Sequence, residues 1–489
     1  WKPNAWLELT RDNDIIFTLD RVEMGQGTYT GLTTLIAEEL DVAPEAIRVE
    51  FAPVAPEYRN PLFGLQLTGG STSVASSWQP LREAGASARL MLVMAAARVW
   101  RVEPGQCKTE GGYVRHPNGL DSMPYGKLVA LADKEVIRGD VPLKPRSQWK
   151  YIGRQAGRLD AEAKSTGQAM YGIDVELPDM VYAVMTRSPR YGGLAVSFNR
   201  DQVQAMPGVL DAFITERGVA VVADRYWRAR KAQEALAVEW DFSEAVGLSN
   251  PDVFKHYRQA AGEDPGEDER VDGDPEAVLE KGSTLVEAEY EQPYLAHATM
   301  EPMNATAWYR DGGMEVWAPT QAPDLGRIAA ARHTDLSPDD VTIHTTFLGG
   351  GFGRRLTQDY IEEAALVAYR VKVPVKLIWS REEDTRHGFF RPAMLHRMAA
   401  SLEDGQLTGW DHQIVGPQIL DWYVRNAAPA QYPWAPKLLY GTLGRVGLMV
   451  EGIATPKDIS AIEGAIGYPY AVPNVRVRHT HTDPGVPIT

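Results

Sequence analysis

Apolar and polar positions follow two different patterns along the first 145 residues. IIFTLDRV and IRVEFAPV are strand-like runs, whereas the apolar positions of TYTGLTTLIAEELD and of an alanine-rich run from about Ser76 to Trp100 suit helices. Two-residue alternation is typical of strands, and recurrence every three to four residues is typical of helices. Residues 1–145 are therefore predicted to form a layered α/β unit.

The middle of the chain changes pattern. Residues 146–245 hold the short strand-like runs MVYAVMTR, GVLDAFI and GVAVVAD and one helix-like run near WRARKAQEALAV, which predicts a compact α+β domain. Residues 246–283 include AGEDPGEDERVDGDPEAV, a polar and acidic stretch predicted to be a surface linker or arm. The α/β pattern resumes in residues 284–489. The predicted fold is therefore a multidomain chain of mixed α/β and α+β class.

Two segments far apart in the chain share one pattern. DVAPEAIRV (41–49) and DLSPDDVTI (335–343) each follow a helix-like run and lead into a strand-like one. One interpretation is a common helix-to-strand connection. The other is a pair of related lobes with similar topology.

Composition limits the classes of function. The chain has 489 residues, 50 Lys plus Arg and 65 Asp plus Glu, for a net charge of −15, which argues against nucleic acid as the main partner. The single cysteine, Cys107, excludes an internal disulfide and any four-cysteine metal site made by this chain alone, so such redox centres are expected on a partner. No apolar run is long enough to predict a transmembrane helix. The chain begins at Trp1 without a signal-like segment, and we expect a processed or incomplete N-terminus.

The stretch FLGGGFGRRLTQDY lies between a strand-like run, VTIHTTF, and a helix-like one. A glycine-rich loop at a helix start exposes main-chain N–H groups to an anion, because a Cβ would block close approach. The alternative is a tight turn packed against a neighbouring strand. The spacing matches neither the dinucleotide-binding fingerprint G-x-G-x-x-G nor the lysine-containing P-loop, so an ordinary dinucleotide-binding or ATP-binding fold is not indicated. The residues that indicate an anionic ligand are Gly349, Gly350, Gly351, Gly353, Arg354 and Arg355.

Two further loops have the same character. EMGQGTYTGL places Gly25 and Gly27 before a helix, with the amide of Gln26 between them. LTGGSTSVASS places two glycines and three hydroxyls before the alanine-rich run: Gly69, Gly70, Ser71, Thr72 and Ser73. Three such loops in one chain predict a large polyanionic ligand held from several sides.

The stretch YLAHATMEPMNATAWY puts His297 four residues before Glu301. That spacing suits metal ligands on a helix, but Pro302 and the alternation of ATAWY favour an extended segment, so a zinc site is disfavoured. His297 is either a hydrogen-bonded structural residue, which we favour, or a proton-transfer group.

In this order, EMGQGTYTGL, GGSTS, YLAHATMEP, GGGFGRR and GYPYAVPNVRV resemble the molybdenum-binding large subunits of the xanthine oxidase family. The resemblance is strongest to the branch of isoquinoline 1-oxidoreductase and membrane-bound aldehyde dehydrogenase. STGQAMYGIDVELPDMVYAVMTRSPRYGG and MPGVLDAF look like the hammerhead domain of that family. EMGQG precedes this domain here, an order that resembles this branch and not the xanthine oxidases themselves.

The resemblance implies a molybdenum–molybdopterin cofactor, in bacteria usually the cytosine dinucleotide, with no protein side chain on the metal. It implies that the substrate pocket includes His297, Glu301 and Leu356. The cofactor-binding residues that it implies are Gly25, Gln26, Gly27, Gly69, Gly70, Ser71, Thr72, Ser73, Gly350, Gly351, Phe352, Gly353 and Arg354.

Two departures from the family pattern matter. Leu356 stands where the purine hydroxylases of the family carry a glutamate, so purine oxidation is disfavoured. The chain stops at HTDPGVPIT, before the position of the family's catalytic glutamate, the general base. The catalytic residue is therefore unknown and is expected outside these 489 residues, on another polypeptide or in a longer subunit.

The expected function is that of the larger part of a molybdenum hydroxylase subunit that oxidises an aldehyde to a carboxylic acid. Oxidation of an N-heteroaromatic ring is the alternative substrate chemistry. Electrons are expected to pass to a small iron–sulfur subunit with 2Fe–2S clusters and on to a cytochrome c subunit with haem c. The periplasm, with membrane association through a partner only, is expected, and the cytoplasm is the alternative. Rival hypotheses are a non-catalytic scaffold that cradles the cofactor and a carbohydrate or nucleotide enzyme.

Overall fold

The computed structural model describes residues 1–154, 157–282, 284–419 and 459–489. They fall into two compact units, each made of discontinuous segments. Unit 1 comprises Trp1–Met180, Asn304–Gly351 and Gln358–Lys376, and unit 2 comprises Val181–Met303, Phe352–Thr357 and Leu377–Thr489. The division into four consecutive segments that the sequence suggested stays a prediction. Within these described ranges, no helix combines the length and hydropathy that crossing a membrane requires.

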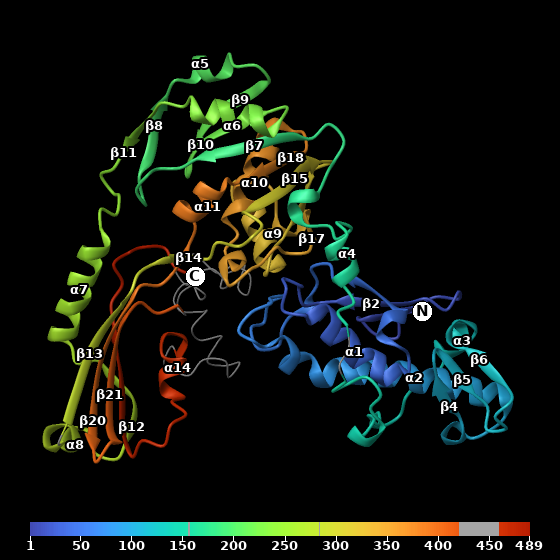
Figure 1. Cartoon of the computed structure of the whole chain (residues 1–489). Coiled ribbons are helices and arrows are strands. Elements are labelled where there is room, and N and C mark those ends of the chain that lie inside the picture. The colour runs from blue at the N-terminus through green and yellow to red at the C-terminus, as the bar shows by residue number, and fades with distance from the viewer. Residues whose placement is uncertain (155–156, 283, 420–458) are drawn as a thin grey trace. The chain divides into compact units, whose positions relative to one another are not determined.

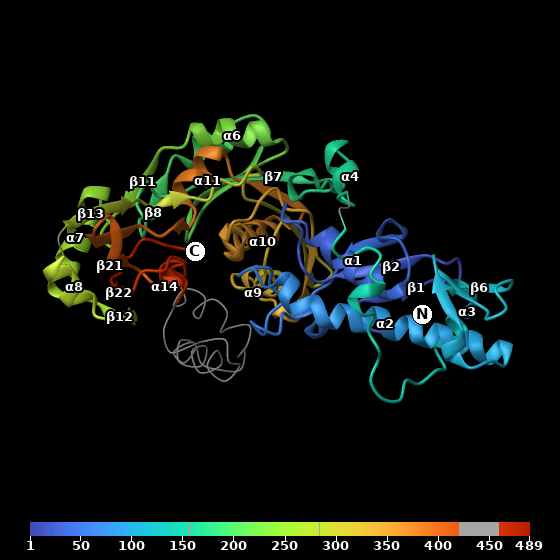
Figure 2. The ribbon, with the colours of Figure 1, turned by 60° about the horizontal axis from the view of Figure 1, so that its bottom comes forward.

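The first layer of unit 1 is a β–α–β unit. Strand β2 (Ile15–Leu19) runs parallel to β3 (Ile47–Phe51), and helix α1 (Thr28–Leu40) connects them, while β1 (Leu7–Leu9) is antiparallel to β2. The long helix α2 (Ser73–Trp100) packs against α1 (Figure 2). The strands, the connecting helix and the alanine-rich helix predicted from the pattern are thus confirmed.

A smaller group of elements extends this layer. Strands β4 (Lys108–Glu110), β5 (Tyr113–Arg115) and β6 (Ser122–Pro124) form an antiparallel meander, followed by α3 (Tyr125–Ala132). The short helix α4 (Ala161–Ser165) comes next. Val114 of β5 and Tyr125 of α3 belong to the same hydrophobic core as α1 and α2, so the meander and α3 pack against the layer.

The second layer of unit 1 repeats the β–α–β arrangement. Strand β15 (Asn304–Arg310) pairs antiparallel with β16 (Gly313–Ala318), which runs parallel to β17 (Val341–Thr345), with α9 (Pro323–Ala331) between them. Helix α10 (Asp359–Val371) follows, and β18 (Val375–Ile378) lies at the unit boundary. The two echoed sequence segments both form a 3-10 turn that enters the returning parallel strand, Pro44–Ala46 and Pro338–Asp340. The echo therefore reflects a shared local topology.

Unit 2 begins with a small α+β arrangement. Strands β7 (Val181–Thr186), β10 (Gly218–Ala223) and β9 (Val209–Thr215) form an antiparallel group in that order, and β8 (Leu194–Phe198) pairs with β11 (Val238–Asp241). Helices α5 (Arg200–Gln204) and α6 (Tyr226–Glu234) complete it. Its core joins Val184 and Val221 to Ala229 of α6. The predicted class of mixed α/β and α+β is confirmed.

The rest of unit 2 centres on a five-stranded sheet (Figure 1). Its strand order is β12 (Glu267–Asp272), β22 (Asn474–His481), β21 (Gln406–Gly416), β20 (Met394–Glu403) and β13 (Thr284–Gln292). Strands β14 (Leu295–Ala296) and β19 (Phe390–Arg391) form a separate pair. The remaining helices are α7 (Asn250–Glu263), α8 (Pro275–Lys281), α11 (Arg381–His387) and α14 (Glu463–Ile466).

The acidic segment 246–283, expected to be a surface linker or arm, has regular structure. It forms α7, β12 and α8, and α7 buries Val253, Phe254 and Tyr257 in a core shared with Leu395 and Val415 of the sheet. The apolar spacing of α7 follows one helical face, but the surrounding acids and glycines hide it from a composition-based assignment.

Candidate functional site

The loop between β2 and α1 is built around the carboxylate of Glu23. This side chain is buried and accepts main-chain N–H groups from Gly25 at 2.8 Å, Gly27 at 3.3 Å and Tyr29 at 2.9 Å. Gly25 and Gly27 have φ of 112° and 95°, values that glycine adopts without strain. The anion at this helix start is therefore a side chain of the chain itself.

Two cations from the α4 region hold Glu23 in place. Arg158 Nη2 lies 2.7 Å and Lys164 Nζ 3.2 Å from Glu23 Oε1, and both also bind the carboxylate of Asp160, at 2.8 and 2.5 Å. Arg158 also donates to the carbonyl oxygen of Gly25 at 2.8 Å. We call these four residues, Glu23, Arg158, Asp160 and Lys164, the Glu23 clasp.

The clasp carboxylates stay ionised. Burial alone would raise the pKa of Glu23, but the N–H of Tyr29 and the charge of Lys164 outweigh it, so the pKa lies below its usual value. For Asp160, burial again raises the pKa, and the hydrogen bonds from Arg158 and Lys164 outweigh it and bring it to about 2. The clasp is thus a fixed arrangement of charges around the loop.

Gln26 is the exposed residue at the tip of this loop, and its amide turns back toward the main chain. Its Oε1 accepts the N–H of Met24 at 2.8 Å, and its Nε2 donates to the carbonyl oxygen of Val22 at 2.8 Å. The amide nitrogen retains a second hydrogen for another acceptor. Its predicted role beside the cofactor stays a prediction.

The second predicted loop, Gly69 to Ser73, leads into α2. Gly70 and Ser71 have φ of 59° and 55°, and the hydroxyl of Thr72 donates to the carbonyl oxygen of Gly69 at 2.8 Å. Thr72 also accepts from Asn60 Nδ2 at 2.8 Å, so its hydroxyl fixes the loop itself. Ser71 is exposed and Ser73 is half-buried.

The structure brings the glycine loops of unit 1 together. The N–H of Val22 donates to Thr68 Oγ1 at 2.8 Å, and the N–H of Leu348 donates to the carbonyl oxygen of Glu23 at 3.2 Å. Gln321 binds Thr68 through two hydrogen bonds of 2.9 Å. A Cβ on Gly351 would lie 2.6 Å from both Met24 Sδ and Gln321 Oε1, so any larger residue there would displace these two side chains. Thr68 and Gln321 act as the connecting residues, and no local sequence pattern marked either of them.

The second half of the GGGFGRR stretch belongs to unit 2. Phe352 has φ of 55° and is 70% exposed, and Gly353 has φ of 98°. Arg354 and Arg355, which we expected to face an anion, are both buried. The guanidinium of Arg355 donates to the carbonyl oxygen of Glu301 at 2.7 Å and lies 3.3 Å from Glu301 Oε2. Arg355 and Glu301 therefore form a buried pair that supports the loop.

Arg354 and His297 lie close to each other and to Gly353 in unit 2. The Arg354 guanidinium is 5.3 Å from the Trp379 ring and 5.9 Å from the Phe389 ring. His297 Nε2 would be 3.7 Å from a Cβ on Gly353. Burial first, and then the charge of Arg354, lower the pKa of His297 to about 4, so the imidazole is neutral near pH 7. As expected, His297 and Glu301 lie outside any helix, and Leu356 is half-buried in a 3-10 turn.

The segments that contain these loops are similar to known proteins. Residues 2–178 and 261–418 each match a model of a molybdopterin cofactor-binding domain. The chain is 32% identical over 455 residues to isoquinoline 1-oxidoreductase subunit beta of Brevundimonas diminuta, covering 83% of this chain and 58% of the relative. It is 30% identical over 436 residues to the membrane-bound aldehyde dehydrogenase (pyrroloquinoline-quinone) of Gluconacetobacter polyoxogenes, covering 84% and 55%.

Among solved structures, quinoline 2-oxidoreductase from Pseudomonas putida 86 aligns with a TM-score of 0.47 at 18% identity, covering 67% of this chain and 44% of that one. The domain matches define a class, proteins with molybdopterin cofactor-binding domains. Within that class, the chain belongs to the molybdenum-binding large subunits of the xanthine oxidase family. It spans a little over half of the length of the two curated relatives.

The described residues fit a molybdopterin. Nothing lies within 4 Å of the Cβ positions of Gly25 and Gly27, so the main chain there is open to a ligand. The hydroxyls of Ser71 and Ser73 stand at the start of α2, where the helix dipole favours a phosphate. The loops that carry these residues and Gly351 meet inside unit 1. The assignment of each cofactor-binding residue stays a prediction.

Proposed function

We propose that this chain is the larger part of the catalytic subunit of a molybdenum-dependent dehydrogenase that oxidises an aldehyde to the carboxylic acid. The observation that carries the proposal is the meeting of glycine loops from both matched domains, through Val22 with Thr68 and Leu348 with Glu23. The molybdopterin, when bound, supplies the two-electron oxidation. The catalytic base stays unassigned.

The chain's own residues would position the cofactor and the substrate. Gly25, Gly27 and Gly351 keep the main chain close to the cofactor, and the Glu23 clasp fixes the loop that carries the first two. The exposed ring of Phe352 offers an apolar wall to a substrate. Neutral His297 beside Gly353 offers a hydrogen bond without adding a charge. Leu356 supplies no polar anchor for a ring nitrogen, which favours an aldehyde.

A second candidate is oxidation of an N-heteroaromatic ring of the isoquinoline type. The observation that favours it is the 32% identity to a relative named isoquinoline 1-oxidoreductase subunit beta. A third, from another class, is a non-catalytic scaffold that cradles the cofactor. The kcat/KM values of the purified full-length assembly, measured for aldehydes and for isoquinoline with a dye acceptor, separate the three.

The test begins with elemental analysis of that assembly. Molybdenum together with preferred oxidation of aldehydes supports the proposal. Molybdenum with preferred oxidation of isoquinoline supports the second candidate, and molybdenum without turnover of either supports the scaffold. A protein without molybdenum, despite cofactor supply during expression, contradicts all three.

We further propose a small iron–sulfur subunit with 2Fe–2S clusters and a cytochrome c subunit with haem c as partners, because Cys107 alone cannot hold a cluster. The relative from Brevundimonas diminuta is itself named as a subunit. The cytosine dinucleotide form of the cofactor is tested by release of cytidine monophosphate on acid hydrolysis. The periplasm, with membrane association through a partner, is tested by cell fractionation.

A further inference from the structure

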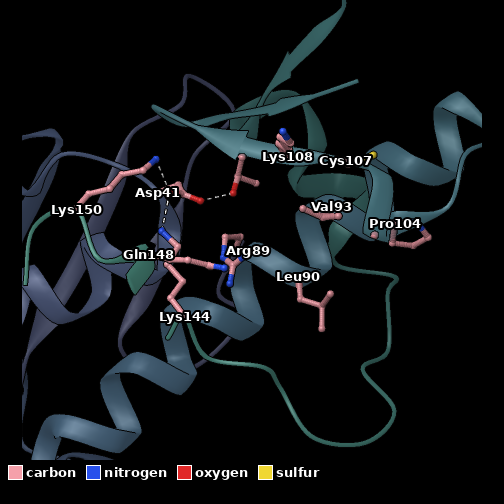
Figure 3. Close-up of a pocket in the computed structure, with 12 residues that line it drawn as sticks. Asp41, Arg89, Leu90, Val93, Pro104, Cys107, Lys108, Lys144, Gln148 and Lys150 are labelled. Carbon is pink, nitrogen blue, oxygen red and sulfur yellow. Dashed lines mark hydrogen bonds and ion pairs between the residues drawn. The ribbon is translucent and has the colours of Figure 1, made fainter. Parts of the chain in front are cut away.

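A cavity of about 630 Å³ opens in unit 1 at the C-terminal end of α1 (Figure 3). Its walls come from α2, from the segment that leads into β4 and from the segment 144–150. Helix α1 has 13 residues and is therefore about 20 Å long, with the Gly25–Gly27 loop at its other end. The cavity is thus separate from the glycine loops.

Positive charge dominates the lining of this cavity, although the chain as a whole carries a net charge of −15. Arg89, Lys108, Lys144 and Lys150 line it, and Asp41 is the one acidic residue among the lining residues that the structure describes. Figure 3 shows Lys144 and Lys150 meeting at Asp41, with the guanidinium of Arg89 close by. We call this site the lysine pocket.

The single carboxylate is fully engaged. Asp41 Oδ1 lies 2.6 Å from Lys144 Nζ and 2.9 Å from Lys150 Nζ, and Oδ2 accepts the hydroxyl of Thr109 at 2.5 Å. Two ammonium groups therefore share the carboxylate of Asp41. Lys108 pairs with β5 through its main chain, whereas its ammonium group makes no hydrogen bond or ion pair with the residues that the structure describes.

The two acidic residues that precede Asp41 are buried and each accepts several hydrogen bonds. The carboxylate of Glu38 accepts the main-chain N–H groups of Lys150, Tyr151 and Ile152, at 2.7–3.1 Å. Glu39 Oε1 accepts two hydrogen bonds from the guanidinium of Arg82, at 2.9 and 2.7 Å. Glu38 Oε1 also lies 3.5 Å from Lys144 Nζ, and Glu39 Oε2 lies 3.8 Å from Arg89 Nη2, so these carboxylates offset part of the charge of the lysine pocket. Lys108 and Lys150, which shares Asp41 with Lys144, still leave the lining with more positive than negative charge.

The opposite wall is apolar. Leu90 and Val93 of α2 and Pro104 line it. A site with converging cations on one side and aliphatic side chains on the other suits a small organic molecule that carries a phosphate group. Lysine binds phosphate as a compact point charge, and the pocket volume lies within the usual range of small-molecule sites.

We propose that the lysine pocket binds a phosphate-bearing small organic molecule, with the phosphate between Lys108, Lys150 and Arg89. The apolar part of the ligand lies against Leu90 and Val93. Since the contacts are largely electrostatic, affinity falls as salt concentration rises. The site is independent of the molybdenum chemistry.

Cys107 gives a direct probe, because it lines the pocket and is half-buried. The full-length assembly is alkylated with neutral iodoacetamide, and the rate at the Cys107 peptide is followed by mass spectrometry. Adenosine monophosphate is the organic probe and inorganic phosphate the ion probe. The proposal expects adenosine monophosphate to slow alkylation saturably and more strongly than phosphate does.

The variant Lys108→Gln with Lys150→Gln should weaken this protection at least about tenfold, because it removes two charge-assisted contacts. The matched control is Lys127→Gln with Lys134→Gln, two exposed lysines of the α3 region, which changes net charge equally. Lys108→Gln alone repeats the test without touching the Asp41 contacts. The proposal is overturned if adenosine monophosphate leaves the alkylation rate of Cys107 unchanged, or if the pocket variant and the control variant lose protection equally. It is also overturned if inorganic phosphate alone protects Cys107, which would mean an adventitious ion only.

Discussion

At the residue scale, Glu23 determines the shape of the loop that carries Gly25, Gln26 and Gly27. Its carboxylate takes up three main-chain N–H groups that the helix start would otherwise leave without partners. Arg158 and Lys164 then balance its charge. The loop therefore depends on a charge as well as on glycine.

We predict that Glu23→Gln destabilises this loop locally by about 1–3 kcal/mol, because an amide cannot replace a carboxylate that accepts from six donors. Arg158 is 40% exposed, and solvent takes up part of the lost charge, which limits the effect. Hydrogen exchange of the N–H groups of Gly25, Gly27 and Tyr29 measures it, and protection should fall about tenfold or more. Glu162→Gln, an exposed site in α4, is the control. Equal protection in both variants would contradict the prediction.

Asp160 provides a pH test of the same clasp. Because its folded pKa is about 2, below the ordinary value of 3.8, its contribution is present above pH 3.8 and is lost as pH falls through 2. We predict that Asp160→Asn is less stable than the wild type by about 1–2 kcal/mol at pH 7. Urea unfolding measured at pH 7 and at lower pH should show that the difference in stability between the variant and the wild type becomes smaller as pH falls toward 2. A gap that is constant with pH would mean that packing, and not charge, is responsible.

The sequence predicted individual residues unevenly. It marked Gly25, Gly27 and Gly351, because glycine between a strand and a helix has a local signature. It could not pair Glu23 with Arg158, which lies 135 residues away. It also placed Arg355 beside an anionic ligand, whereas the structure pairs it with the buried Glu301. Partners that are distant in sequence leave no local pattern to find.

At the element scale, the contact between α1 and α2 depends on a missing side chain. A Cβ on Gly85 of α2 would lie 2.9 Å from the carbonyl oxygen of Ile36 and 3.0 Å from Glu39 Cβ. The two helix backbones are therefore in close contact at this point. Arg82 of α2 also donates a hydrogen bond to Glu39 of α1, so the two helices are held together at this point.

We predict that Gly85→Ala destabilises unit 1 by about 1–3 kcal/mol, since the added methyl group forces the helices apart. Gly31→Ala in α1 is the matched control, because its Cβ would meet nothing within 4 Å. Alanine in an open helix position should stabilise the protein by about 0.5–1 kcal/mol. Thermal unfolding compares the two variants, and a shift in the same direction for both would contradict the packing argument.

Helices and strands with a clear period could be predicted from the sequence, and α1, α2, α10 and β17 were. The segment 246–283 could not, because its acidic residues and glycines indicate a linker while Val253, Phe254 and Tyr257 bury one face of α7. Burial against Leu395 and Val415, which come more than 130 residues later, stabilises that helix. Tertiary packing of this kind overrides composition.

At the scale of the whole molecule, the two units differ in their titratable cores. Unit 2 contains the four histidines whose pKa is lowered among the described residues: His297, His387, His396 and His412. Burial is the largest cause for each of them. Unit 1 contains the Glu23 clasp, whose carboxylates have lowered pKa values. Acid should therefore act on the units in different pH ranges.

We predict that unit 2 loses stability at higher pH than unit 1. A histidine whose folded pKa lies near 4 and whose unfolded value is 6.5 is neutral in both states above pH 6.5. As pH falls from 6.5 toward 4, the unfolded state takes up the proton first, so the folded state loses stability over this range. The clasp carboxylates lose their stabilising contribution only below their ordinary values near 4. Hydrogen exchange at pH 6.5 and pH 5, corrected for intrinsic rates, should show increased exchange in unit 2 peptides alone. His412→Asn should reduce that increase, because it removes one buried histidine that takes up a proton more readily in the unfolded state. An equal increase of exchange in both units would contradict this assignment.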